Sequence, residues 1–367
     1  MTDNAAASPS DLSTCHHRAG GPPTWTGDYV CGQRIAGFAL TRDPGPVDQV
    51  LVDGEEDLAS PPYRPLPVPG DQAAAIERTG PSPINDLAAD GLLQEAAQVV
   101  GEGLDRQLSA MGENGDFIRK LLDEIAAQGH LAWLVGGAVR DLMAAGTSAC
   151  PADLDFTGTI GPGELYDALR RWRRAQGAAD CRPFISRQLV WAVAPPRGGR
   201  PDAFVEYKPL SQPGFRFPAW GGSLARDAST RDLTINAIYY DHRNRVIADP
   251  TGRGIQDLLA TPHRIAVTPY RGDDPIEQAC VILRCLKFLL RWPGLDVDGI
   301  SAWAARLPGD LVTEIPEARR PLLIGFRDRC IPQQYRGTRK LDAAARQIGP
   351  VAERLLEQIG VLEKAET

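Results

Sequence analysis

The chain has 367 residues, with 40 Lys and Arg against 47 Asp and Glu, so its formal net charge is −7 at pH 7. This balance excludes a uniformly basic coat for nucleic acid, although it permits a local basic patch. With 43% hydrophobic and 24% charged residues, the composition is that of a globular protein. The length predicts about two or three domains, each large enough to bury a core.

Several features of the sequence favour a cytoplasmic protein without a membrane span. No apolar run reaches the length of about 18 residues that a transmembrane helix needs, and residues 1–13 lack the order of a secretory signal. Seven irregularly spaced Cys favour reduced thiols. The nearest metal-like group consists of Cys15, His16, His17 and Cys31. It lacks a CxxC pair, so we expect ordinary loop residues there rather than a zinc site.

Residues 1–83 are rich in Pro and Gly and form an appendage to which we assign no function. Two short apolar runs, Ile35–Leu40 and Val50–Val52, can pair as a hairpin across the turn at Asp43–Pro46. A small β appendage and a partly disordered segment both fit this composition.

From residue 85 the pattern changes to regular elements. Apolar spacing predicts a helix around Leu87–Val100 and an amphipathic helix over Asp116–Gln128. A short apolar run, Leu131–Val135, then predicts a strand that ends in a diglycine turn. A helix is expected over Ala138–Ala145.

The next elements alternate between strand and helix. Asp153–Thr157 has the alternation of a half-buried strand, and Leu165–Trp172 reads as a helix. Two further strands, Gln188–Ala194 and Ala203–Tyr207, flank a Pro- and Gly-rich hairpin turn. From Leu283 onward the pattern is helical, with breaks at Pro293, Pro308, Pro316, Pro332 and Pro350.

Asp153 and Asp155 are one residue apart on a predicted strand, so both carboxylates point to the same face. Two like charges a few ångströms apart repel each other unless a cation lies between them. Mg²⁺ prefers such carboxylate oxygens, and the pair is therefore a candidate metal site. The alternative is two solvent-exposed Asp on an edge strand.

Gly136 and Gly137 lie between a predicted strand and a predicted helix. Glycines there allow backbone amides to approach a ligand closely, and the helix N-terminus favours phosphate. Arg140 lies one turn inside that helix and could join in binding a nucleotide. The alternative is a glycine turn that serves packing alone.

Glu206 has apolar neighbours on a predicted strand, and a place beside the Asp153–Thr157 strand would make it a third catalytic carboxylate. The alternative is a rim Glu that pairs with an Arg or Lys, and Asp202 is the substitute candidate. Farther along, Asp232 and Asn236 are four residues apart and would share a helix face. Arg231 can pair with phosphate, while Asp232 and Asn236 can hold ribose hydroxyls or orient an Arg.

In this order the motifs resemble those of class II tRNA nucleotidyltransferases and bacterial poly(A) polymerases. The resemblance rests on LVGGAVRDLM, DLDFTGT, TRDLTINAIYYD, ADPTGRGIQDL and the pair DDP and LRCLKF. It extends from Leu131 to Phe288, somewhat under half of the chain.

The resemblance implies an α+β fold: a polymerase-β-like nucleotidyltransferase head, with a mixed sheet flanked by helices, and a short all-helical extension. We place the appendage at 1–83, the head at 84–250 and the neck-like extension at 251–367. The resemblance also implies a two-metal Mg²⁺ reaction with the metals on Asp153 and Asp155. The substrate would be an NTP, ATP or CTP, whose NMP is added to a tRNA-like RNA 3′ end as pyrophosphate leaves.

The chain departs from the family pattern at several positions. Thr230 replaces the first Arg of the RRD motif, and Arg253 replaces a Gly. In the segment where the family reads the base, Asp274 is kept but Glu277 stands where the family has Arg. This segment also has about four extra residues, one helical turn, so Arg284 is the candidate substitute. CTP-then-ATP specificity is therefore not carried over.

The acceptor and the oligomeric state stay open. The basic residues that follow the head are Arg319, Arg320, Arg327, Arg329, Arg336, Arg339, Lys340 and Arg346. They form either a patch for RNA phosphates or a solvated helix face with scattered ion pairs. The short C-terminal part and the acidic net charge favour a second hypothesis, in which the same transfer acts on a small molecule or a protein. A third is a non-enzymatic relic of the fold, against which the intact motifs count.

Overall fold

The computed structural model describes residues 49–51, 91–146, 151, 154–160, 165, 182–186, 191–194, 205–210, 224–268 and 274–360. By its internal contacts the chain divides into two compact units, which we describe separately. Unit 1 comprises residues 1–230 and 238–250, and unit 2 comprises residues 231–237 and 251–367. The assignment of 1–83, 84–250 and 251–367 to three domains stays a prediction.

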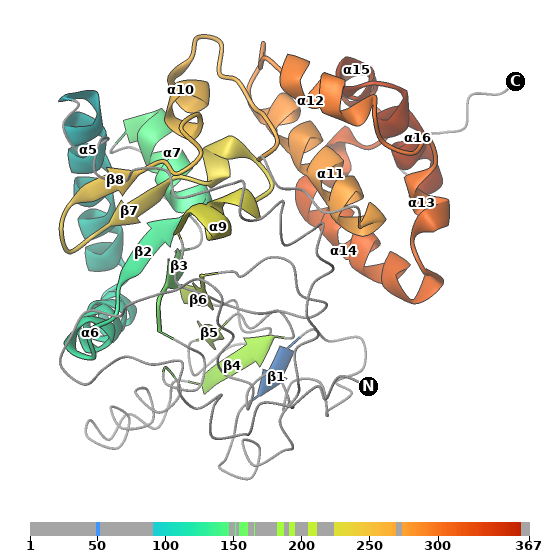
Figure 1. The fold of residues 1–367 in the computed structure, drawn as a ribbon. Coiled ribbons are helices and arrows are strands. Elements are labelled where there is room, and N and C mark those ends of the chain that lie inside the picture. Colours follow the sequence, from blue (N-terminus) through green and yellow to red (C-terminus); the bar gives the residue numbers. More distant parts are fainter. Residues whose placement is uncertain are drawn as a thin grey trace, which may run out of the picture. The chain divides into compact units, whose positions relative to one another are not determined.

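Unit 1 is built on a mixed sheet (Figure 1). In the described residues it has eight strands, in the order β1-β4-β5-β6-β3-β2-β7-β8. Their bounds are Gln49–Leu51 (β1), Ala132–Val135 (β2), Asp155–Gly158 (β3), Arg182–Ser186 (β4), Trp191–Ala194 (β5), Val205–Pro209 (β6), Tyr239–Asp241 (β7) and Val246–Ala248 (β8). The pair β3–β6 is parallel and all other pairs are antiparallel. The predicted mixed sheet is confirmed.

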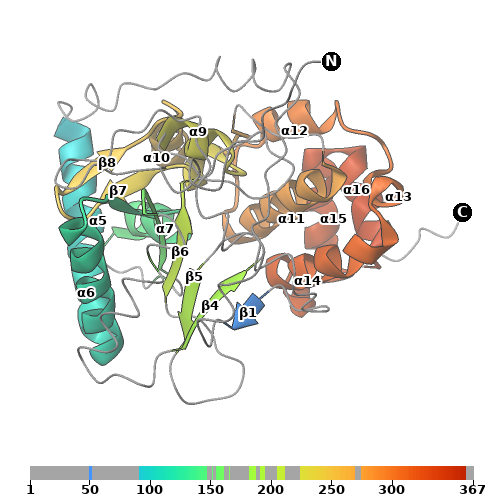
Figure 2. The same cartoon turned by 60° about the horizontal axis from the view of Figure 1, so that its bottom comes forward.

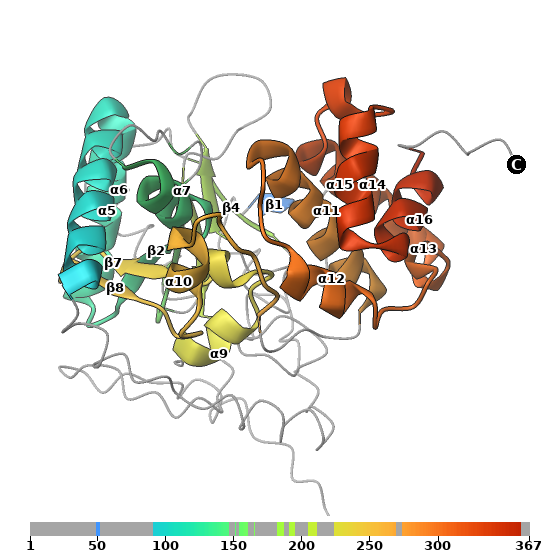
Figure 3. The same ribbon diagram turned by 90° about the horizontal axis from the view of Figure 1, so that it is seen from above.

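The helices of unit 1 in the described residues are α5 (Gly91–Ala110), α6 (Glu113–Ala127), α7 (Gly137–Ala145) and α9 (Leu224–Ser229). The predicted amphipathic helix is α6, whose apolar residues at three- and four-residue steps, Phe117 to Ile125, are buried. Figure 3 shows α5 and α6 side by side, and α5 also packs on α7 and β8. A Cβ on Gly103 of α5 would clash with Cδ2 of Leu142 on α7, so the side chain of Leu142 would have to shift.

The strand predictions have mixed outcomes. β5 and β6 pair as expected, with Trp191 opposite Tyr207, although their connecting turn lies outside the described residues. Val50 lies opposite Ile185 of β4, while its expected partner, Ile35–Leu40, also lies outside. Of the predicted helix Leu165–Trp172, only Leu165 is described, and it is helical.

Unit 2 is helical in its described residues, as Figure 2 shows, which confirms the expected helical extension. Its helices are α10 (Gly254–Leu259), α11 (Pro275–Arg291), α12 (Asp298–Ala304), α13 (Leu311–Glu314), α14 (Arg320–Cys330), α15 (Arg339–Ile348) and α16 (Pro350–Gln358), with 3₁₀ turns η3 (Thr234–Asn236), η4 (Glu317–Arg319) and η5 (Gln333–Tyr335). The buried helix α11 contacts α13, α14, α15 and α16. None of the helices in the described part of the chain could span a membrane.

The first long helix of unit 2 begins earlier than the sequence pattern suggested. α11 begins at Pro275 rather than at Leu283, because Asp274 caps it and accepts a hydrogen bond from the backbone N–H of Ile276. Proline fits the first helical position, because a backbone N–H there would have no partner within the helix and its absence costs no hydrogen bond. Pro350 opens α16 in the same way, directly after Gly349 ends α15 with a φ of 125°.

Candidate active site

Two candidate catalytic carboxylates lie on neighbouring parallel strands of unit 1. Asp155 is the first residue of β3, and its Cα partner on β6 is Glu206. The backbone N–H of Glu206 donates to the carbonyl of Leu154 at 3.1 Å, which fixes this register. Both side chains are half-buried. Side chains at paired positions point to the same face of a sheet, so the two carboxylates lie on one face.

The predicted partner of Asp155 on its own strand, Asp153, lies outside the described residues. Among the residues that are described, no group of three or more His, Cys, Asp and Glu side chains is placed to hold a metal ion. The Cys15, His16, His17 and Cys31 group also lies outside the described part. The carboxylates of Asp155 and Glu206 are the oxygen donors that Mg²⁺ prefers, so this donor pair fits the ion that the sequence predicts.

The diglycine turn lies directly beside Asp155. Val135, the last residue of β2, is the Cα partner of Asp155, and Gly136 follows it. Gly136 has φ 75° and ψ −132°, a conformation that L-residues with a side chain rarely adopt. A Cβ at this position would lie 3.6 Å from Oδ2 of Asp155, so the turn brings its backbone close to that carboxylate.

Helix α7 begins at the turn, with Gly136 as its N-cap. Its first internal hydrogen bond runs from the N–H of Arg140 to the carbonyl of Gly136, at 3.1 Å. The N–H groups of the first turn have no partner within the helix, and the N-terminal end of the helix dipole favours an anion. A nucleotide phosphate beside the Asp155 carboxylate would therefore meet backbone donors.

Arg140 is a buried cation at the same turn. Its side chain is 7% exposed and pairs with Asp141 at 2.9 Å. Its Nη2 atom lies 3.5 Å from the place that a Cβ on Gly137 would occupy. Since a buried cation is costly without compensating partners, the Asp141 carboxylate stabilises its charged form there.

In unit 2, the carboxylate of Asp232 links the η3 turn to α11. Oδ1 accepts from the side-chain amide of Asn236 at 2.9 Å and from the backbone N–H of Leu233 at 2.8 Å. Oδ2 pairs with Nε of Arg284 on α11 at 2.8 Å. Asp232 therefore orients an Arg, but that Arg comes from a segment distant in the sequence.

The helix expected to carry Asp232 and Asn236 is absent from the described segment, and that prediction is wrong. Leu233 instead forms an isolated antiparallel bridge with Val267, and only Thr234–Asn236 make a short 3₁₀ turn. The Asp232 side chain bonds to the backbone of the next residue, which competes with regular helix formation. Arg231 lies just before this turn, and its carbonyl accepts a hydrogen bond from the Thr268 hydroxyl.

The 3₁₀ turn itself is held by a buried carboxylate. Asp257 of α10 is 1% exposed and accepts a hydrogen bond from the Thr234 hydroxyl at 2.7 Å. Arg253, the residue that departs from the family pattern, lies 3.6 Å from the same carboxylate. The substituted position thus contributes a cation to this part of unit 2.

Asp274, predicted to bind the nucleotide, is engaged within unit 2. Besides capping α11, it pairs with both terminal nitrogens of Arg319, at 2.9 and 3.2 Å. Glu277 is exposed in the first turn of α11. The pairing of Arg319 with Asp274 was missed because the two residues are 45 positions apart and no local pattern links them.

Several members of the basic C-terminal cluster hold the helices of unit 2 together. Arg336 pairs with Asp328 and donates to the carbonyl of Ile331, and Lys340 donates to the carbonyl of Leu290. The hydrogen bond from Arg327 lowers the pKa of the Asp328 carboxyl. These contacts favour the interpretation of a helix face with ion pairs over that of a bare phosphate-binding patch.

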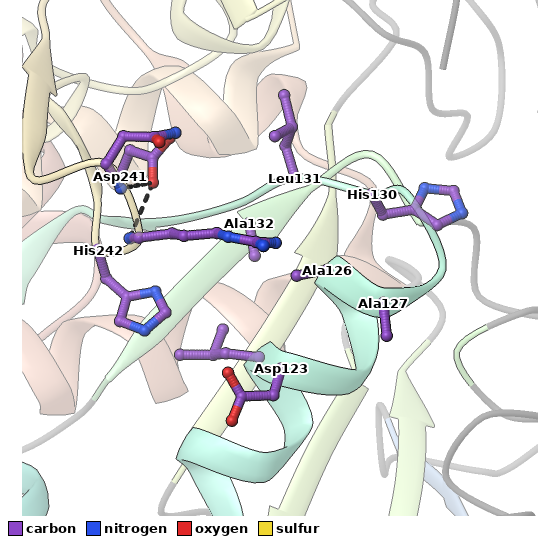
Figure 4. A pocket seen from close by; sticks show the side chains of 11 residues that line it. Asp123, Ala126, Ala127, His130, Leu131, Ala132, Asp241 and His242 are labelled. Carbon is purple, nitrogen blue, oxygen red and sulfur yellow. Dashed lines mark hydrogen bonds between the residues drawn. The ribbon is translucent and has the colours of Figure 1, made fainter. Parts of the chain in front are cut away.

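Unit 1 also has a cavity of about 260 Å³, whose lining residues Figure 4 shows. Its lining includes Ala132, at the end of β2 opposite to Val135, together with Asp123 of α6 and His242 of the turn after β7. Burial lowers the pKa of the His242 imidazole. The strand length of β2 separates this cavity from the diglycine turn, so it is not part of the candidate active site.

Comparisons with known proteins agree with the motifs. Residues 132–262 match the family model of the poly A polymerase head domain. The chain is 28% identical over 217 residues to poly(A) polymerase I of Haemophilus influenzae, which covers 56% of this chain and 45% of that protein. It is 34% identical over 75 residues to a tRNA nucleotidyltransferase of Schizosaccharomyces pombe, or 19% of this chain and 14% of that protein.

Among solved structures, the chain is similar to the CCA-adding enzyme of Bacillus stearothermophilus in complex with CTP. The TM-score is 0.44 with 20% sequence identity, over 63% of this chain and 51% of that one. The chain spans less than half the length of the poly(A) polymerases that it matches. Residues 132–262 are therefore similar to the head domain of poly(A) polymerases.

Proposed function

We propose that the chain is a Mg²⁺-dependent nucleotidyltransferase that transfers NMP from ATP or CTP to an RNA 3′ end, with a tRNA-like acceptor, and releases pyrophosphate. The observation that carries this proposal is the pairing of Asp155 with Glu206 directly beside the glycine turn at Gly136. The names of the curated relatives support the acceptor class.

In this proposal Asp155 and Glu206, together with Asp153, hold Mg²⁺. The bound ions would lower the pKa of the acceptor hydroxyl and neutralise the charge of the leaving pyrophosphate. The half-buried place of the two described carboxylates supports this role, because partial exclusion of water strengthens their attraction for a divalent cation.

The remaining residues bind and orient the nucleotide. Gly136 and Gly137 present backbone N–H groups to phosphate at the start of α7, and Arg140 adds a cation at the same turn. Within unit 2, Arg231 is the candidate for contact with phosphate, and Asp232, itself held by Asn236, fixes the side chain of the nucleotide-binding candidate Arg284. Catalysis of this kind depends on positioning and charge neutralisation, so it requires no Ser or His nucleophile.

The proposal is tested by labelling. Purified protein, Mg²⁺ and radiolabelled ATP or CTP are incubated with tRNA that lacks its 3′ end. We expect the wild type to label the RNA and Asp155→Asn to abolish labelling, as should the double variant Asp153→Ala with Asp155→Ala. Asp123→Asn on α6 is the matched control, since Asp123 is an exposed carboxylate beside the separate cavity.

Two results would contradict parts of the proposal. Labelling that survives the double variant would overturn the assignment of the carboxylates. Inert RNA, combined with labelling of a small molecule or a protein in an acceptor screen, would keep nucleotidyl transfer but replace the acceptor.

A further inference from the structure

The guanidinium group of Arg284 in unit 2 is held from two directions. Its Nε atom pairs with Oδ2 of Asp232 at 2.8 Å. Its central carbon lies over the ring of Phe326, 5.2 Å from the ring centroid. Phe326 belongs to α14, which packs against α11, the helix that carries Arg284. The side chain of Arg284 is nevertheless 37% exposed, so it remains within reach of a ligand.

The carboxylate on one side of Arg284 is itself fixed. Asn236 and the backbone N–H of Leu233 both donate to Oδ1 of Asp232. This leaves Oδ2 directed at Arg284. The carboxylate can therefore not rotate without losing two hydrogen bonds, and it fixes the direction of the Nε–H bond.

The aromatic ring on the other side attracts cations through its electron-rich face. A second guanidinium, that of Arg329, lies 5.4 Å from the same ring centroid. Arg329 is three residues after Phe326 on α14, so the two share a helix face. Phe326 thus gathers two cations at one place in unit 2.

A long Arg side chain loses rotamer freedom when it binds a ligand, and a site that restricts it beforehand reduces this cost. Resting on the function proposed above, we infer that Phe326 is a positioning residue. Its ring, with Asp232, holds the guanidinium of Arg284 in the orientation that binds the incoming nucleoside triphosphate. Phe326 acts through Arg284 and does not itself contact the reacting atoms.

The kinetic test compares substitutions that keep or remove the ring. Phe326→Leu keeps the apolar bulk, and we expect the KM for NTP to rise about three- to tenfold, with little change in kcat. Phe326→Tyr keeps the aromatic face and should retain the wild-type KM. Tyr335→Leu is the matched control, since it removes the ring of another cation–π pair, formed with Lys340, and should leave the KM unchanged.

A double-mutant cycle separates positioning from general damage to the fold. In an Arg284→Met background, Phe326→Leu should raise the KM no further, because the group through which it acts is gone. An equal effect of Phe326→Leu in both backgrounds would overturn the inference. A change in kcat alone would do the same.

A readout without activity makes the inference independent of the enzyme assay. The NMR signal of the Arg284 Nε–H, assigned by its loss in Arg284→Met, should be shifted by the ring current of Phe326. The shift should disappear in Phe326→Leu and persist in Phe326→Tyr. If the wild type is active but the Arg284 Nε–H signal has the same shift in Phe326→Leu, this inference alone is overturned. If the wild type neither binds NTP nor labels an acceptor, the proposed function is overturned.

Discussion

Asp155 and Glu206 face each other as Cα partners in β3–β6, the one parallel pairing among the described strands. They are 51 positions apart in the sequence, so the sheet topology alone brings them together. Two carboxylates on one sheet face repel each other, and a divalent cation between them relieves that repulsion.

Glu206→Gln is expected to reduce nucleotidyl transfer by about 100-fold or more, since a lost metal interaction is worth several kcal/mol and about 1.4 kcal/mol corresponds to a tenfold change in rate. Part of the loss should be recovered at high Mg²⁺ concentration, because the variant weakens the hold on the ion. The measurement is the initial rate of labelling over a Mg²⁺ titration. Should the variant match the wild type at every Mg²⁺ concentration, Glu206 is a rim residue and not a third carboxylate.

Gly136→Ala should destabilise the turn beside Asp155. The backbone there has φ 75°, and a side chain in such a conformation costs roughly 1–3 kcal/mol. Gly137→Ala is the control, because Gly137 has no positive φ and its added Cβ would make only an ordinary contact with Arg140, at 3.5 Å. Urea denaturation should give a lower free energy of unfolding for Gly136→Ala than for Gly137→Ala. If Gly137→Ala instead had the lower free energy of unfolding, the positive φ at Gly136 would not be the reason for glycine at that position.

Local pattern was sufficient to predict several elements of unit 1. The apolar run at Leu131–Val135 identified the strand β2, and the three- and four-residue periodicity identified α6, which buries one face. The hairpin spacing likewise placed Trp191 and Tyr207 on paired strands. These patterns depend only on residues close in sequence, which is why they could be read without a structure.

The contacts of unit 2 could not be read in this way. The helix periodicity around Asp232 and Asn236 was misleading, because the side chain of Asp232 bonds to the local backbone and Leu233 pairs with Val267. The pairing of Arg284 with Asp232 spans 52 positions, and it depends on how distant segments pack. A family motif indicates that such residues matter, but it does not indicate which of them touch.

The role of Asp274 can be decided by Asp274→Asn. Asn caps a helix about as well as Asp, so α11 should keep its start, while the bidentate ion pair with Arg319 is weakened. Because both carboxylate oxygens are already engaged, we expect the KM for NTP to change less than about twofold. We expect the free energy of unfolding to fall by about 1 kcal/mol or less, since the pair is partly exposed. A change in the preference between ATP and CTP would instead support the base-reading role predicted from the sequence.

The stability of the protein should depend on pH through His242. Burial lowers the pKa of this imidazole below its ordinary value of 6.5, although Asp241 and Asp123 nearby act in the opposite direction. The contribution of neutral His242 is therefore complete above about pH 6.5 and is lost as the pH falls below that value, because the unfolded chain takes up the proton first.

Replacing His242 by Gln removes the titrating group while keeping a polar side chain, so the variant should lose less stability between about pH 7.5 and about pH 5.5 than the wild type does. The measurement is the urea midpoint of both proteins at each pH. Comparing the two proteins cancels the titration of all other groups, since these are common to both. Equal losses in the wild type and in His242→Gln would show that the imidazole keeps its ordinary pKa in the folded protein.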